Sequence, residues 1–201
     1  LYPLHDRLPQ LHFLNVLRYI STRTLLGMLT SLAICLFLGP WFIRQLRAMQ
    51  IGEKVRDDGP ATHKKKAGTP TMGGSLILFC LVVSTLLWCD LTNRLVLLAL
   101  GVTVAFGAIG FADDYLKIVR KDHHGLRPRW KMGWTLVAGL AVGMSLIALA
   151  NLEPPLYNTR VIFPFFKWLI PDLGWLYVIF AVIVLAGTTH AVNLTDGLDG
   201  L

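Results

Sequence analysis

Apolar residues occur along the chain in five blocks that are separated by more polar stretches. The blocks cover residues 24–43, 73–89, 95–112, 132–150 and 176–192. About 20 apolar residues are enough for a helix to span a bilayer, and a helix satisfies its own backbone hydrogen bonds where water is absent. The pattern therefore predicts an all-α, polytopic membrane protein, a helical bundle with about five transmembrane helices in this chain.

Composition supports this class of protein. Of the 201 residues, 54% are hydrophobic and only 15% are charged, which is too apolar for an ordinary soluble domain. Cys35, Cys80 and Cys89 lie within or at the end of apolar blocks and show no CxxC spacing, so we expect neither a zinc site nor a redox site. The lipid bilayer is the expected partner, and no nucleic acid is expected.

The distribution of basic residues indicates the orientation in the membrane. Thirteen of the 19 Lys and Arg residues fall in two polar stretches, residues 44–72 and 113–131. Short loops rich in Lys and Arg stay in the cytoplasm. We therefore predict that these two loops, and the tail after the fifth block, are cytoplasmic, and that the N-terminus lies outside.

Asp113 and Asp114 stand side by side where the third apolar block ends. Ionisable groups in or beside a membrane span are costly and are commonly functional. The simpler alternative is that the pair caps a helix end and faces water, since acids at the interface are common. Because the other unusual polar groups are predicted on the same side of the membrane, we favour a functional pair of carboxylates.

A second candidate site precedes the second apolar block. Lys66 ends a lysine triplet and is followed by the turn sequence GTPTMGG at residues 68–74. A basic residue beside a glycine-rich turn with threonines is suited to bind phosphate or diphosphate. The alternative is that the lysines bind anionic lipid heads and fix the topology. We favour the lipid role for Lys64 and Lys65 and phosphate binding for Lys66.

A third candidate site follows the last apolar block. Asn193, Asp196 and Asp199 recur every three residues, and Gly197 and Gly200 accompany them. On a helix each step of three residues turns by about 300°, so the three positions fall within a sector of about 120°. An amide and two carboxylates at the end of a span can bind hydroxyls, amides or a cation. The glycines would let a ligand approach the backbone.

Taken together, these motifs resemble the polyprenyl-phosphate N-acetylhexosamine-1-phosphate transferases. The resemblance rests on GTPTMGG at 68–74, GFADDY at 110–115, RWK at 129–131 and NLTDGLDG at 193–200. It covers essentially the whole chain. The GTPTMGG run resembles those family members that act in peptidoglycan synthesis, and the other motifs are common to the wider family.

The resemblance implies that phospho-MurNAc-pentapeptide passes from UDP-MurNAc-pentapeptide to undecaprenyl phosphate, giving lipid I and UMP, with Mg²⁺ as cofactor. It also implies a homodimeric protein of the bacterial inner (cytoplasmic) membrane, with ten spans and a cytoplasmic active site. The family's main Mg²⁺ ligand lies in its C-terminal half. We therefore expect residues 1–201 to form one integral-membrane transferase domain that is truncated at the C-terminus and inactive alone.

The resemblance also suggests roles for single residues. Asp113 is expected to be the base that deprotonates or orients the polyprenyl phosphate, and Asp114 is expected to support the metal or the local network. An alternative makes an aspartate a covalent nucleophile. Further residues are expected to bind the donor. Its uridine is expected to contact Lys66, Gly197, Leu198 and Asp199. Its sugar–diphosphate part is expected to contact Thr71, Asn193 and Asp196.

Two other functions fit the residues less well. A related transferase would use a different UDP-hexosamine, and the GTPTMGG run argues against it. A transporter or lipid-binding scaffold would have no catalytic role. Transporters commonly place charged groups near the bilayer midplane, whereas the carboxylates here are predicted at the cytoplasmic ends of spans.

Overall fold

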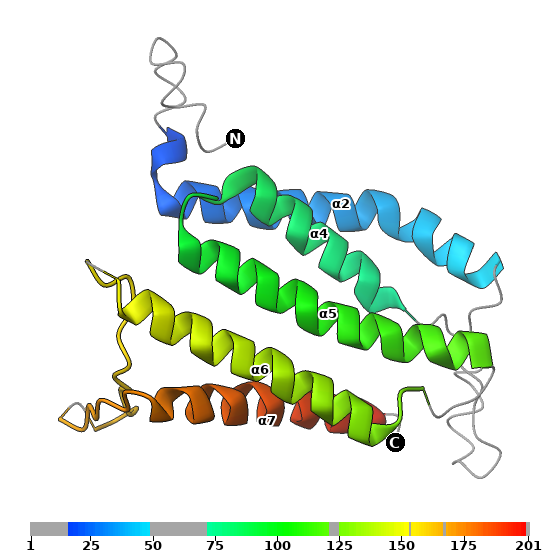
Figure 1. Ribbon diagram of the computed structural model, residues 1–201. Coiled ribbons are helices and arrows are strands. Elements are labelled where there is room, and N and C mark those ends of the chain that lie inside the picture. The colour runs from blue at the N-terminus through cyan, green and yellow to red at the C-terminus, as the bar shows by residue number, and fades with distance from the viewer. Residues whose placement is uncertain (1–15, 49–71, 121–124, 153, 167, 200–201) are drawn as a thin grey trace. The chain divides into compact units, whose positions relative to one another are not determined.

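The computed structural model describes residues 16–48, 72–120, 125–152, 154–166 and 168–199, and it describes no side chain beyond Val192. Within these ranges the chain forms five helices, namely α2 (Ile20–Ala48), α4 (Gly73–Trp88), α5 (Arg94–Arg120), α6 (Pro128–Ala150) and α7 (Leu176–Asp199) (Figure 1). Each apolar block of the sequence lies almost entirely within one of them. The prediction of an all-α fold is confirmed for this part of the chain.

In the described part of the chain, α2, α5 and α6 are long and apolar enough to cross a membrane. Helix α4 and the apolar part of α7, Leu176–Val192, are also apolar but shorter. With 16 residues, α4 is about 24 Å long, somewhat less than the ~30 Å hydrocarbon core of a bilayer. The helices therefore support a membrane bundle, and the crossing of the membrane by α4 and α7 stays a prediction.

Four helices extend past the apolar blocks that predicted them, and one of these is α7, which continues to Asp199. Helix α2 reaches Ala48, α6 already begins at Pro128, and α5 continues to Arg120. The predicted loop 113–131 is therefore wrong at both of its ends. Proline suits the first turn of a helix because its missing N–H is not needed there. In α5 the helix continues through the acidic pair because Lys117 lies four residues after Asp113 and can pair with it along the helix.

The first compact unit, Leu1–Gly125, contains α2, α4 and α5. Helix α4 packs against both of the other helices. Towards α2, Trp88 Nε1 donates a hydrogen bond to Thr30 Oγ1 at 2.9 Å. Towards α5, Gly107 lies so close to Leu78 that a Cβ at this position would be 2.5 Å from Leu78 Cδ2. Small residues thus allow close helix packing in this unit.

The second unit, Leu126–Leu201, contains α6 and α7, which pack against each other. Two glycines of α6 face valines of α7. A Cβ at Gly139 would lie 3.3 Å from Val182 Cα, and one at Gly143 would lie 2.9 Å from Val178 Cα. Close backbone approach at small residues is the usual way in which helices associate in lipid, where no hydrophobic effect drives their contact.

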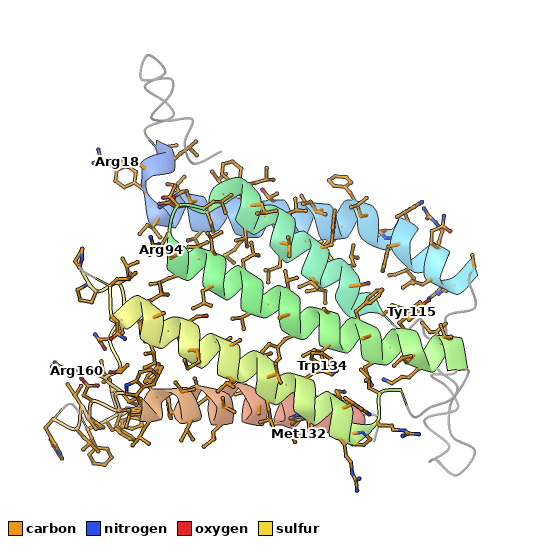
Figure 2. The ribbon with its side chains drawn as sticks, in the orientation of Figure 1. Arg18, Arg94, Tyr115, Met132, Trp134 and Arg160 are labelled. Carbon is orange, nitrogen blue, oxygen red and sulfur yellow. The ribbon has the colours of Figure 1, made fainter. Side chains whose placement is uncertain are left out.

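Many large apolar side chains project outward from the helices (Figure 2). Phe37 of α2 is 83% exposed, and Ile183 of α7 is also exposed. Such surfaces are unfavourable in water and are expected where helices face lipid.

Candidate active site

The two adjacent aspartates lie in α5, about two turns before its last residue. Asp113 is buried, with 8% of its surface exposed, whereas the side chain of Asp114 is 36% exposed. Neighbouring positions on a helix point about 100° apart. One carboxylate therefore turns into the protein and the other turns toward the surface. The alternative reading, that the pair caps a helix end, is wrong because the helix continues past both residues.

Lys117 joins the two carboxylates. Its Nζ lies 3.2 Å from Asp113 Oδ2 and donates a hydrogen bond to Asp114 Oδ1 at 3.0 Å. One ammonium between two carboxylates offsets the repulsion between the adjacent acids. From the sequence, Lys117 counted only as one of the basic residues of a cytoplasmic loop. Its spacing of three and four residues from the two acids was the signal that could have identified it.

The chain returns over this cluster at Gly125. This residue is buried and has φ +48°, a backbone conformation that favours glycine. A Cβ at this position would lie 2.6 Å from Asp113 Oδ1 and 2.9 Å from Lys117 Cε. Only glycine satisfies both the backbone and the available space. The main chain at Gly125 thus covers Asp113 and limits the access of water to it. The sequence pattern gave no sign of this role for Gly125.

An exposed aromatic pair lies beside the aspartates on α5. The rings of Phe111 and Tyr115 stack with centroids 6.2 Å apart, and both side chains are exposed. Tyr115 lies near one end of α5, and Arg94 lies at the other (Figure 2). Tyrosine is enriched where a membrane meets water. These positions favour a location of the acidic pair near the headgroups instead of the bilayer centre.

The glycine-rich turn is described only from Met72 onward. Met72 has φ 72°, and α4 begins at the next residue, so the left-handed backbone agrees with the predicted turn. Among the described residues, nothing would lie within 4 Å of a Cβ at Gly73 or Gly74. The backbone of this first helical turn is therefore open to approach. Lys66 and Thr71 lie outside the described residues.

The predicted donor-binding motif of the C-terminal stretch lies in α7, whose helix runs to Asp199. A helical backbone is confirmed for all five of its residues, Asn193, Asp196, Gly197, Leu198 and Asp199. Their side chains lie outside the described part of the structure. The motif belongs to the second compact unit and the aspartate pair to the first. That the two meet in one site stays a prediction.

Asp114 is the residue of this chain that was predicted to hold Mg²⁺. Magnesium prefers carboxylate oxygens and commonly takes water and substrate phosphates as further ligands. Asp114 fits this role, because its carboxylate is partly exposed and Lys117 bonds only its Oδ1. Within the described residues no three His, Cys, Asp or Glu side chains come together as a metal site. Further ligands are therefore needed.

Comparison with known proteins decides the family. Residues 96–201 match the family described as Glycosyl transferase family 4, and residues 66–78 match signature 1 of the phospho-N-acetylmuramoyl-pentapeptide-transferases. The chain belongs to glycosyl transferase family 4. The match to the family covers both aspartates and the α7 motif, and the match to the signature covers Lys66 and Thr71. Every predicted site residue thus lies in a matched stretch.

Relatives in this family cover the whole chain. The phospho-N-acetylmuramoyl-pentapeptide-transferase of Desulforapulum autotrophicum is 51% identical over 201 residues, and the protein of the same name from Syntrophus aciditrophicus is 47% identical. Each comparison covers 100% of this chain and 54% of the relative. The chain therefore spans about half the length of these relatives. The resemblance found from the motifs is confirmed.

Proposed function

We propose that this family 4 chain is part of an enzyme that transfers phospho-MurNAc-pentapeptide from UDP-MurNAc-pentapeptide to undecaprenyl phosphate, forming lipid I and UMP. One observation carries the proposal. A buried aspartate is joined to a second one through Lys117 near the end of a helix of membrane length. The phosphate of a lipid acceptor lies at this depth, at the boundary between lipid and water. The names of the two relatives support the choice of substrates.

Asp113 is the proposed general base. It takes the proton of the acceptor phosphate or orients that phosphate for attack on the donor. Lys117 keeps the carboxylate in place and offers a positive charge to the approaching anion, while Gly125 limits the access of water. The alternative, attack by Asp113 itself, needs in-line access to a phosphorus atom. The 8% exposure of Asp113 favours the role as base.

Asp114 is the proposed ligand for Mg²⁺ in this chain. When bound, the ion would neutralise charge on the donor diphosphate. Lys117 fixes the direction of the Asp114 carboxylate through Oδ1. The remaining ligands would come from the donor and from the other half of the enzyme.

Residues of the glycine-rich turn and of the α7 motif are both proposed to contact the donor. Lys66 would contact the uridine together with Gly197, Leu198 and Asp199. The sugar–diphosphate part would lie against Thr71, Asn193 and Asp196. Two facts support this assignment. The signature match begins at Lys66, and the open first turn of α4 offers backbone N–H groups of the kind that bind phosphate.

The enzyme is proposed to be a homodimer in the bacterial inner membrane, with its active site in the cytoplasm and its N-terminus outside. The bias of basic residues toward residues 44–72 and 113–131 supports this orientation. Bacterial relatives support the location.

The test is release of UMP from UDP-MurNAc-pentapeptide by the detergent-solubilised protein. The 201-residue chain is assayed beside a form extended to the length of its relatives. We expect the extended form to release UMP only with undecaprenyl phosphate and Mg²⁺ present. Turnover with UDP-GlcNAc instead would indicate a sister transferase. No turnover by the extended form with either donor would overturn the proposal of a transferase.

Within this assay, Asp113→Asn should lower the rate of the extended form by about 10²–10⁴-fold, because loss of a general base has effects of that size. Asp90→Asn is the matched control, since Asp90 lies in the connection between α4 and α5 and pairs there with Thr92. Its rate should stay normal. Normal turnover of Asp113→Asn would remove Asp113 from the mechanism.

A further inference from the structure

The connection between α6 and α7 contains a short hairpin whose base is held by backbone bonds. Arg160 and Asp172 form an isolated antiparallel bridge. Val161 N–H donates to the Pro171 carbonyl at 3.0 Å, on the inner side of this bridge. These contacts hold together the two ends of the loop between Arg160 and Asp172.

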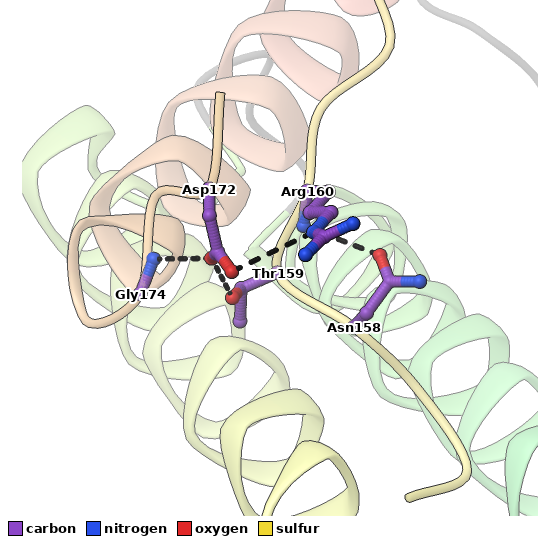
Figure 3. Close-up of polar contacts among 5 residues, drawn as sticks. All are labelled: Asn158, Thr159, Arg160, Asp172 and Gly174. Carbon is purple, nitrogen blue, oxygen red and sulfur yellow. Dashed lines mark hydrogen bonds and ion pairs between the residues drawn. The ribbon is translucent and has the colours of Figure 1, made fainter. Parts of the chain in front are cut away.

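Polar side chains reinforce the same base. The Asp172 carboxylate accepts hydrogen bonds from the Thr159 hydroxyl and, at 3.1 Å, from the Gly174 N–H, and it lies 3.9 Å from Arg160 Nε (Figure 3). Asn158 Oδ1 accepts a hydrogen bond from the Arg160 N–H. We refer to residues 158–160 and 172–174 as the polar clasp. Hydrogen bonds from Thr159 and Gly174 hold the pKa of Asp172 below its ordinary value.

The hairpin beyond the clasp is apolar and exposed. We refer to residues 162–166 and 168–170 as the aromatic tip. Phe165 is 96% exposed, Trp168 is 81% exposed and Ile162 is 70% exposed. The tip itself carries no charged residue, and the sequence has one charge between its two parts, at Lys167. A contiguous apolar surface of this kind marks a contact with a partner or a membrane.

Phe165 adds a separate observation. Its φ is 72°, in the left-handed region that bulky side chains rarely adopt. The clasp holds the two ends of the loop, and the loop presents this ring almost completely to its surroundings. Unusual backbone conformations of this kind persist where the surrounding structure enforces them and are concentrated at functional positions.

The location of the hairpin indicates what it contacts. It lies between α6, a helix of membrane length that ends at Ala150, and the apolar start of α7 at Leu176. The two ends of the hairpin thus lead to apolar helices, one of which is long enough to cross a membrane. Tryptophan and other aromatic side chains are enriched at the membrane–water boundary. Charges at the base and aromatic rings at the tip match the change from water to lipid across that boundary.

We propose that the aromatic tip inserts into the leaflet beside the ends of α6 and α7, while the polar clasp stays in water. Insertion is shallow. Within the tip, Phe166 and Leu169 donate their N–H groups to carbonyls inside the loop, and Pro164 has no N–H. The other N–H groups among the described residues of the tip need water, which is present among the headgroups but absent from the hydrocarbon core. The hairpin thereby anchors the α6–α7 pair to the membrane surface.

The experiment places an environment-sensitive NBD label on single cysteines in the full-length protein, in nanodiscs of phosphatidylcholine and phosphatidylglycerol. Native cysteines are replaced by serine. Phe165→Cys and Phe166→Cys report on the tip, and Asn158→Cys in the clasp is the control. Quenching is measured with nitroxide lipids labelled near the headgroup and with iodide in the water. Two tip positions guard against failure of one variant to fold, which is checked by size-exclusion chromatography.

We expect the tip labels to emit at shorter wavelength and to be quenched several-fold more strongly by the nitroxide lipids than the clasp label. Iodide should quench the clasp label more strongly. Equal quenching of all labels by iodide would overturn the proposal and place the tip in water. Protection of the tip labels from both quenchers would overturn it too, in favour of a protein partner. These outcomes do not depend on transferase activity.

Discussion

At the scale of single residues, the candidate site depends on the groups that surround a buried carboxylate. Asp113 has a salt bridge to Lys117 and is covered by the main chain at Gly125. Burial of a carboxylate is costly unless a positive charge and hydrogen bonds compensate for the lost water. Lys117 supplies that charge from the next turn of the same helix. The glycine lets the covering chain come close without a steric clash.

Gly125→Ala is expected to lower transferase activity of the full-length enzyme at least tenfold, because the new Cβ would lie 2.6 Å from Asp113 Oδ1 and must displace that carboxylate. The loss should appear mainly in kcat, measured by UMP release, since the variant disturbs the base and leaves the donor-binding motifs intact.

Gly174→Ala is the matched control. Gly174 has the same φ of +48°, but a Cβ there would meet nothing within 4 Å. The two variants therefore share the backbone strain and differ in the steric clash. If both variants lose activity equally, strain or misfolding explains the effect and the contact with Asp113 does not.

At the scale of the elements, close packing between α6 and α7 gives the second unit its geometry. The backbones of the two helices approach each other where Gly139 and Gly143 face valines. In lipid, such contacts depend on shape, because lipid tails are as apolar as the side chains that they would replace. Added volume at the contact is therefore harmful.

Gly143→Ala should destabilise the packing of α6 on α7 by about 1–3 kcal/mol, the usual cost of overpacking. The reason is the 2.9 Å distance from the new Cβ to Val178 Cα, a backbone atom that cannot move aside alone. Unfolding in mixed micelles with increasing SDS measures the effect. Gly187→Ala in α7 is the control, since nothing lies within 4 Å of its Cβ, and its stability should be unchanged or higher. A Gly143→Ala variant as stable as this control would contradict the packing.

A tyrosine pair ties the connection after α6 to the first turn of α7. The rings of Tyr157 and Tyr177 meet edge to face with centroids 5.7 Å apart, and their hydroxyls share a hydrogen bond. Burial, with a contribution from this hydrogen bond, raises the pKa of Tyr157 to about 12. The folded state therefore favours the neutral phenol of Tyr157 over the charged phenolate.

The raised pKa predicts a pH dependence. The contribution of Tyr157 to stability is complete below pH ~10, the pKa of an unfolded tyrosine, and is lost as the pH rises toward 12. The difference in absorbance at 295 nm between the wild type and Tyr157→Phe should show a titration near pH 12. Tyr177→Phe should move that midpoint part of the way toward 10, because burial remains. A midpoint near 10 in the wild type would show that the tyrosine is exposed.

At the scale of the whole molecule, the prediction concerns orientation. In intact cells, a membrane-impermeant maleimide should label Asn158→Cys in the α6–α7 connection, and it should label Thr62→Cys only after the membrane is opened. The reason is the concentration of Lys and Arg in residues 44–72, which predicts that this loop stays in the cytoplasm. Labelling of Thr62→Cys alone in intact cells would reverse the topology.

The sequence by itself determined the class of fold and the elements. Five apolar blocks led to five helices, because the need to satisfy backbone hydrogen bonds in lipid acts along each segment separately. The motifs also pointed to the aspartate pair and to the family. The ends of the helices differ from the ends of the apolar blocks. Helix α5 continues past the apolar block through polar residues, because ion pairs between Lys117 and the two aspartates favour the helix. A search for apolar residues alone does not detect such pairs.

Only the tertiary structure decided which groups touch. It showed that Asp113 is buried and Asp114 is not, that Gly125 covers Asp113, and that the clasp around Asp172 closes the base of a loop whose Phe165 ring is exposed. These facts depend on where the chain returns after each helix. Spacing along the sequence fixes neighbours within one helix, through the 3.6-residue turn. Contacts between segments that are far apart in the sequence depend on how whole helices and loops pack. A local sequence pattern does not contain this information.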